Sequence, residues 1–104
     1  MSKHLLANWK ERVVFSENGP QPQVLEENSL FKVILAGLNP GQRIPVHPEL
    51  GAVYYILQGN GWMTVDEERF PIKEGAIISM GNSAARGMEA ETPLAFLAVR
   101  TGSA

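Results

Sequence analysis

Apolar and polar positions alternate in short runs along most of this chain, and turn residues separate the runs about every 8–12 positions. β-branched and aromatic residues dominate the runs, which is typical of half-buried strands. Many short strands separated by single glycines and prolines indicate an all-β sandwich or barrel. The strands expected from the pattern are 13–15, 23–26, 30–38, 52–57, 62–65, 70–72, 76–80, 86–89 and 94–100.

Helical periodicity is confined to the N-terminus. Leu5, Leu6 and Trp9 fall at roughly helical spacing, which predicts a short helix or turn within residues 3–12. Further along, the polar tip at 66–69 lies between two apolar runs, which is the pattern of a β-hairpin.

The composition is that of one domain. Of 104 residues 44% are hydrophobic, enough for one packed core, so we take 1–104 as a single domain. The net charge of −2, with both signs interspersed, argues against nucleic acid or an anionic membrane as a partner. The absence of cysteine excludes disulfides and thiolate metal sites. No apolar run is long enough for a signal peptide or a membrane span, so we expect a cytoplasmic location.

The most informative spacing begins at Gly41. Five residues separate Gly41 from His47, and Glu49 stands two positions further on. This arrangement resembles the first motif of the cupin family, in which a glycine, five residues and His-x-His precede a glutamate and a glycine. Here Glu49 occupies the second histidine position, and either Ala52 or Tyr54 occupies the glutamate position, depending on which glycine closes the motif.

The segment that begins at Gly75 is similar to the second cupin motif. In the family, a glycine, five residues and Pro-x-Gly precede a histidine and then an asparagine. In this chain Gly81 and Ser83 stand at the proline and glycine positions, Arg86 at the histidine position and Ala90 at the asparagine position. The metal ligand of this motif is therefore replaced by an arginine.

The resemblance covers about residues 30–100 and implies a cupin-type jelly-roll barrel (a double-stranded β-helix) with a site inside its mouth. It also implies a homodimer, in which the outward-facing Tyr55 and Leu57 would lie at the interface. It does not imply one activity, because cupins include enzymes of several classes, storage proteins and sugar-binding domains.

Ligand number decides between a metal-bound and a metal-free barrel. A catalytic first-row metal usually has three protein ligands and an open position. The chain holds two histidines, and only His47 lies in the motif, while His4 would have to fold over the barrel. We therefore expect no metal or other cofactor. The alternative is a divalent metal ion bound by His47 and Glu49, which strand alternation places on one face.

Arg86 changes what the interior can bind. A guanidinium is permanently cationic and matches carboxylate or phosphate groups, so an inward Arg86 either pairs with Glu49 or binds an anionic ligand. Alternation also turns Tyr54 and Met88 inward, giving apolar walls with a few polar groups, as in small-molecule sites. The predicted ligand-binding residues are His47, Glu49, Tyr54, Arg86 and Met88.

The favoured hypothesis is a small cupin that binds a small anionic organic molecule in its barrel, as a binding or sensing module. The rival is an enzyme, either metal-dependent through His47 and Glu49 or a metal-free isomerase or lyase. In the metal-free version His47 is the base, Glu49 orients it and Arg86 holds an anion. A third hypothesis is a structural dimer whose barrel is filled by side chains, with His47 and Tyr54 in purely structural roles.

Overall fold

The computed structural model describes residues 2–48, 50–81 and 84–101. Within these ranges the chain forms a single 3₁₀ turn and nine strands, and no helix there is long or apolar enough to cross a membrane. The all-β prediction is confirmed. The elements are η1 (Trp9–Glu11), β1 (Gln23–Glu27), β2 (Phe31–Leu38), β3 (Arg43–Pro48), β4 (Ala52–Gln58), β5 (Asn60–Val65), β6 (Glu68–Lys73), β7 (Ile77–Met80), β8 (Ala85–Ala90) and β9 (Leu94–Thr101).

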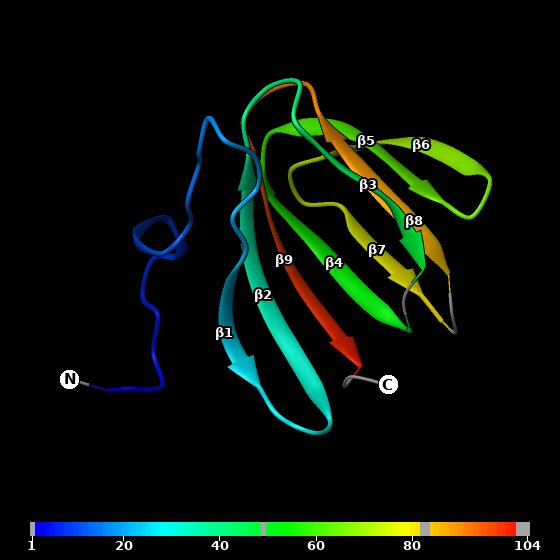
Figure 1. Cartoon of the computed structure of the whole chain (residues 1–104). Helices are drawn as coiled ribbons and strands as arrows, with labels where there is room; N and C mark the ends of the chain where they lie inside the picture. The colour runs from blue at the N-terminus through cyan, green and yellow to red at the C-terminus, as the bar shows by residue number, and fades with distance from the viewer. Residues whose placement is uncertain (1, 49, 82–83, 102–104) are drawn as a thin grey trace.

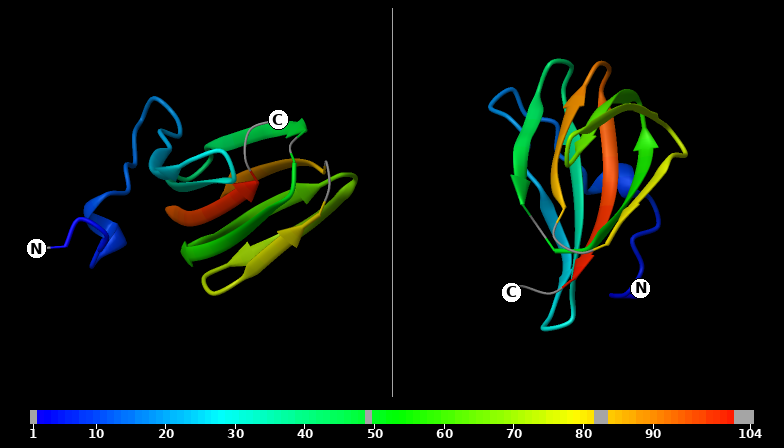
Figure 2. Two further views of the ribbon diagram at one scale, coloured as in Figure 1. Left: turned by 90° about the horizontal axis from the view of Figure 1, so that it is seen from below. Right: turned by 90° about the vertical axis from the view of Figure 1, so that its right-hand side faces the viewer.

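The strands form two sheets that face one another (Figures 1 and 2). Sheet A has five strands in the order β1-β2-β9-β4-β7, and sheet B has four in the order β3-β8-β5-β6. The pairings are antiparallel. β1–β2 and β5–β6 join consecutive strands, whereas pairs such as β2–β9 and β3–β8 join strands that are distant in the sequence. This topology is the jelly roll that the sequence predicted.

The core lies between the two sheets and follows from alternation along each strand. In β4, Ala52, Tyr54 and Ile56 are buried while Val53 and Tyr55 are exposed, as the period of two requires. The core cluster takes residues from both sheets: Ala36, Leu38, Ala52, Tyr54, Ile56, Met63, Ile72, Ile78, Met88, Ala90, Leu94, Phe96 and Ala98.

The N-terminal segment packs on the outer face of sheet A and does not form the strand expected at 13–15. It lies beside β1 and β2 in Figure 1. A Cβ added to Gly37 would lie 2.9 Å from Phe15 Cε1 and 3.0 Å from Val13 Cγ2, so both side chains contact β2 from outside. Leu35, on the same face, is 0% exposed. The expectation was wrong because this apolar run packs onto a sheet without joining a ladder.

β3 is the strand that the hydrophobic pattern did not predict. It contains Pro45 and Pro48, and proline lacks the N–H that a central strand needs. β3 is an edge strand that pairs only with β8, so proline is tolerated there. The β3–β8 register shifts between Ile44 and His47, which bends the strand at this point.

The predicted hairpin is confirmed at β5 and β6. Val65 pairs with Glu68 across a two-residue turn formed by Asp66 and Glu67. Asp66 has φ 54°, the positive value that tight hairpin turns require.

Candidate functional site

Arg86 lies inside the sandwich and is 1% exposed. Its Nε donates a hydrogen bond to the Tyr54 hydroxyl at 2.9 Å, and its Nη1 donates to the Leu50 carbonyl at 3.1 Å. Nη1 also lies 3.5 Å from Met80 Sδ, and the guanidinium carbon is 5.4 Å from the centre of the Tyr54 ring. Contacts from β4 and β7 of sheet A thus fix the orientation of a cation that sheet B supplies.

Alternation along β8 explains this inward cation. Arg86, Met88 and Ala90 occupy every second position of the strand, and all three are buried. The direction expected for Arg86 and Met88 from the sequence agrees with their burial. Met88 belongs to the core cluster and stands opposite Met63 on β5. It therefore forms part of the apolar wall beside Arg86.

His47 stands directly opposite Arg86 in the β3–β8 ladder. Residues directly opposite one another in a ladder share a face, so the imidazole and the guanidinium belong to the same inner face. The Nδ1 atom of His47 lies 2.9 Å from the carbonyl oxygen of Pro45, a contact that restrains the ring. His47 is half-buried, which places it at the rim of the interior.

Tyr54 serves both the core and the polar site. It is 7% exposed, and its ring lies 5.2 Å from the ring of Phe96. Its hydroxyl accepts the hydrogen bond from Arg86. Tyr54 thus fills the core and contacts Arg86, and its role in ligand binding stays a prediction.

Two residues of the sequence motifs, Glu49 and Ser83, lie outside the described residues. The expected pairing of Glu49 with Arg86 stays a prediction. Of the predicted ligand-binding set, the structure brings together four: His47, Tyr54, Arg86 and Met88.

A groove of about 690 Å³ opens at the end of sheet A next to this cluster. Leu50 and Met80, which both contact Arg86, also line the groove. Arg100 of β9 lines it too, and the remaining lining is mostly apolar. Sequence reasoning did not single out Arg100. Arg100 lies at an even spacing from the buried Phe96 in β9, and this spacing in the sequence places both residues on the inner face.

The described residues around His47 do not fit a three-ligand metal site. Within residues 2–48, 50–81 and 84–101, no group of three or more His, Asp or Glu side chains lies close enough to share an ion. His4 is exposed and belongs to the N-terminal segment, which lies beside sheet A, whereas His47 lies on β3 of sheet B. Glu49, the second candidate ligand, lies outside the described residues, so the alternative of a metal ion bound by His47 and Glu49 stays a prediction.

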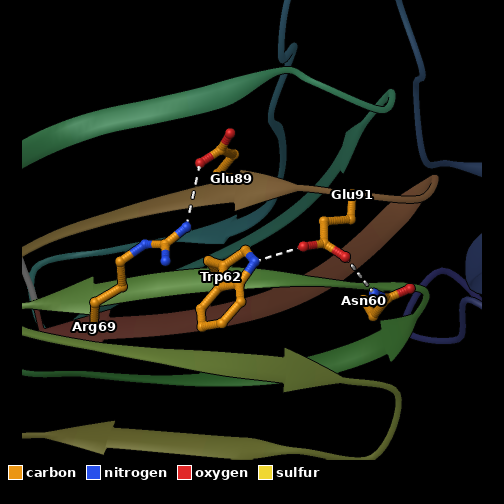
Figure 3. Close-up of polar contacts among 5 residues, drawn as sticks. All are labelled: Asn60, Trp62, Arg69, Glu89 and Glu91. Carbon is orange, nitrogen blue, oxygen red and sulfur yellow. Dashed lines mark hydrogen bonds and ion pairs between the residues drawn. The ribbon is translucent and has the colours of Figure 1, made fainter.

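Sheet B carries a second polar cluster on its outer face, shown in Figure 3. The Arg69 guanidinium lies 4.0 Å from the centre of the Trp62 ring, and its Nη2 is 3.9 Å from Glu89 Oε1. The indole Nε1 of Trp62 donates to Glu91 Oε1 at 2.6 Å, and Asn60 Nδ2 donates to Glu91 Oε2 at 3.3 Å. Because the Arg69 and Glu89 side chains are 55% and 47% exposed, we attribute this cluster to packing of a solvated face.

The protein is thus an antiparallel jelly roll in which a buried arginine, Arg86, stands opposite a histidine at the rim, His47. Among solved structures, the chain is similar to a Streptococcus pyogenes protein of unknown function, at TM-score 0.86 and 20% identity over 100% of this chain and 92% of that chain. An RmlC-like cupin from Desulfovibrio desulfuricans has a TM-score of 0.78 and 25% identity over 97% and 95% of the two chains.

A Klebsiella pneumoniae protein with a double-stranded β-helix domain matches at TM-score 0.84 and 22% identity, over 97% of this chain and 90% of that chain. No protein-family model and no curated protein matches the sequence. The chain therefore has the fold of the small single-domain cupins, and the resemblance predicted from its motifs is confirmed at the level of fold.

Proposed function

We propose that this chain binds a small organic anion in its barrel, next to Arg86, without a catalytic metal. The observation that carries the proposal is the buried guanidinium of Arg86, which is held by Tyr54 and by Leu50, a residue that also lines the groove. A cation of fixed orientation in a site of low polarity is a preorganised receptor for carboxylate or phosphate.

In this proposal the groove is the route to the cation. Arg86 is not among the groove-lining residues, but Leu50 and Met80 both line the groove and contact Arg86, and a methionine side chain rearranges easily because it is unbranched and flexible. Arg100 adds a second cationic side chain to the lining. Apolar walls with few polar groups favour an organic anion over a free inorganic one, since the walls gain from contact with carbon.

Substitution of Arg86 by methionine tests the proposal, because it removes the charge while it keeps a long apolar stem. The probes are acetate, benzoate and inorganic phosphate, titrated by isothermal calorimetry into untreated protein. We expect wild-type protein to bind benzoate best, and Arg86→Met to weaken that binding at least tenfold. Thermal unfolding shows whether the variant is folded. If none of the probes binds wild-type protein, or if Arg86→Met binds benzoate unchanged, the proposal fails.

The metal-free part of the proposal has its own measurement. Elemental analysis of protein purified without chelator should show much less than one iron, manganese, nickel, copper or zinc ion per chain. A near-stoichiometric ion that is lost in His47→Ala would instead support the alternative, a metal site built on His47 and Glu49.

A second candidate function is supported by the position of His47 opposite Arg86. An imidazole beside a cation that holds an anionic substrate suits proton abstraction next to a carboxylate, as in a metal-free isomerase or lyase. The discriminating measurement is exchange of the α-protons of bound carboxylic acids with deuterated water, followed by NMR. Exchange that survives chelation and is abolished in His47→Ala would establish this candidate over a binding module.

A further inference from the structure

A row of directly opposed residues crosses sheet A at the end where the groove opens. Ala52 stands opposite both Met80 on β7 and Arg100 on β9, and Arg100 stands opposite Lys32 on β2. Glu27 on β1 ends the row opposite Lys32. The five strands lie side by side in Figure 1. Because opposed residues share a face and Ala52 is buried in the core, the row belongs to the inner face of the sheet.

The row carries two neighbouring cations. Arg100 and Lys32 are both half-buried, and the Cβ atoms of a directly opposed pair are about 4.5–5.5 Å apart. Like charges at that separation are destabilising unless an anion lies near them. Glu27 supplies such an anion to Lys32, since its Oε2 lies 3.7 Å from Nζ. Arg100 lines the groove and Lys32 does not, so Arg100 is the cation that this row presents to a ligand.

One dipeptide positions both Arg86 and the end of β9. The Leu50 carbonyl accepts a hydrogen bond from Arg86 Nη1 at 3.1 Å. The carbonyl of the next residue, Gly51, accepts from the backbone N–H of Thr101 at 3.0 Å, and Thr101 directly follows Arg100. Consecutive carbonyls therefore fix the place of the buried arginine relative to the strand that carries the second one.

The register gives the scale of their separation. From Met80 to Arg100 there are two strand spacings, or about 10 Å between backbones. Met80 Sδ lies 3.5 Å from Arg86 Nη1, and Met80 lines the groove together with Arg100. A short carbon chain with an anionic group at each end matches this span, whereas a single carboxylate can contact only one of the two arginines.

We propose that the ligand is a small organic dianion, with one anionic group at Arg86 and the other at Arg100, which rests on the proposed function that an anion binds next to Arg86. Both groups meet a guanidinium, whose planar fork matches carboxylate or phosphate. The mostly apolar lining contacts the carbon chain between them. Arg100 thus determines specificity, because it makes two charges bind better than one.

Dicarboxylates and their monomethyl esters test the second charge, because the ester keeps the carbon chain and loses one carboxylate. The probes are succinate, glutarate and adipate, each with its ester, titrated by calorimetry into the full chain at low salt. We expect the best of the three to bind wild-type protein at least about tenfold more tightly than its ester, as for a charge-assisted hydrogen bond. Arg100→Met should reduce this preference to about threefold or less and change benzoate affinity by no more than about threefold.

Two further variants separate charge from position. Arg100→Lys keeps the cation and should retain most of the preference. Arg69→Met makes the same change of side chain on the outer face of sheet B and should leave the preference intact. Thermal unfolding shows whether each variant is folded, and the comparison of acid with ester in wild-type protein decides without any variant.

The outcomes distinguish this inference from the proposed function. Benzoate binding that depends on Arg86, with no dicarboxylate preferred over its ester, would overturn the dianion and leave the anion site standing. A preference that persists unchanged in folded Arg100→Met would overturn the role of Arg100 in the same way. If neither benzoate nor any dicarboxylate binds wild-type protein, both proposals fail together.

Discussion

Arg86 and Arg69 both belong to sheet B, but they face opposite sides of it. Arg86 points into the core at 1% exposure and donates to Tyr54 and Leu50. Arg69 points outward with 55% of its side chain exposed, stacks on Trp62 and forms a 3.9 Å ion pair. The two side chains have the same chemistry, so their surroundings decide how much each contributes to stability. Interactions of a cation are strong where water is excluded and weak where it is solvated.

The largest effect is expected from truncation inside the barrel. Arg86→Ala should lower the free energy of unfolding by about 3 kcal/mol, because it empties a buried volume and removes the donor to the Tyr54 hydroxyl. Urea denaturation measures the change. Arg86→Met separates volume from charge, since it should recover much of the stability but not the binding of benzoate. An Arg86→Ala variant as stable as wild type would remove the energetic contrast with Arg69.

Removal of one hydroxyl should have an intermediate effect. Tyr54→Phe keeps the ring that packs against Phe96 and deletes the acceptor for Arg86 Nε. We expect a loss of about 1 kcal/mol in unfolding free energy, the usual contribution of a buried hydrogen bond, together with weaker anion binding as the guanidinium loses a fixed contact. Calorimetric titration of benzoate checks the second effect. Unchanged affinity in a destabilised variant would show that Tyr54 matters only to the core.

The same contrast shows what the sequence could and could not predict. The interior residues could be predicted from the sequence. Alternation along β4 and β8 predicts that Tyr54, Arg86 and Met88 point inward, and the motif spacing identifies His47. The inferences for Tyr54, Arg86 and Met88 use the period of a strand, whereas that for His47 uses the spacing of the family motif. The facing of His47 and Arg86 also needs the β3–β8 pairing, which joins distant parts of the chain, and the family motifs supplied it.

The polar cluster on the outer face of sheet B (Figure 3) was not predicted, because it depends on the register between strands. Thr64 stands opposite Arg69 in the β5–β6 hairpin, so Trp62, two positions away on the same face, becomes a diagonal neighbour of Arg69. The two-residue turn at Asp66 and Glu67 fixes this register, but the hydrophobic pattern predicts a longer polar tip at 66–69. The edge strand β3 was missed for a different reason, since its prolines obscure the strand pattern.

The smallest effect is expected on the outer face. Arg69→Ala should cost at most about 0.5–1 kcal/mol, because the cation–π contact with Trp62 and the ion pair with Glu89 are both exposed to solvent. Glu89→Gln, which removes the ion pair and keeps the stacking, should cost less still. Raising the salt concentration should abolish the cost of Glu89→Gln and leave only the stacking part of the cost of Arg69→Ala. Urea denaturation at two salt concentrations measures both, and the fluorescence of Trp62 in a Trp9→Phe background reports whether the stacking is lost. The two arginines differ mainly in burial. If Arg69→Ala lowered the free energy of unfolding as much as Arg86→Ala, exposure would not control the contribution of these cations to stability.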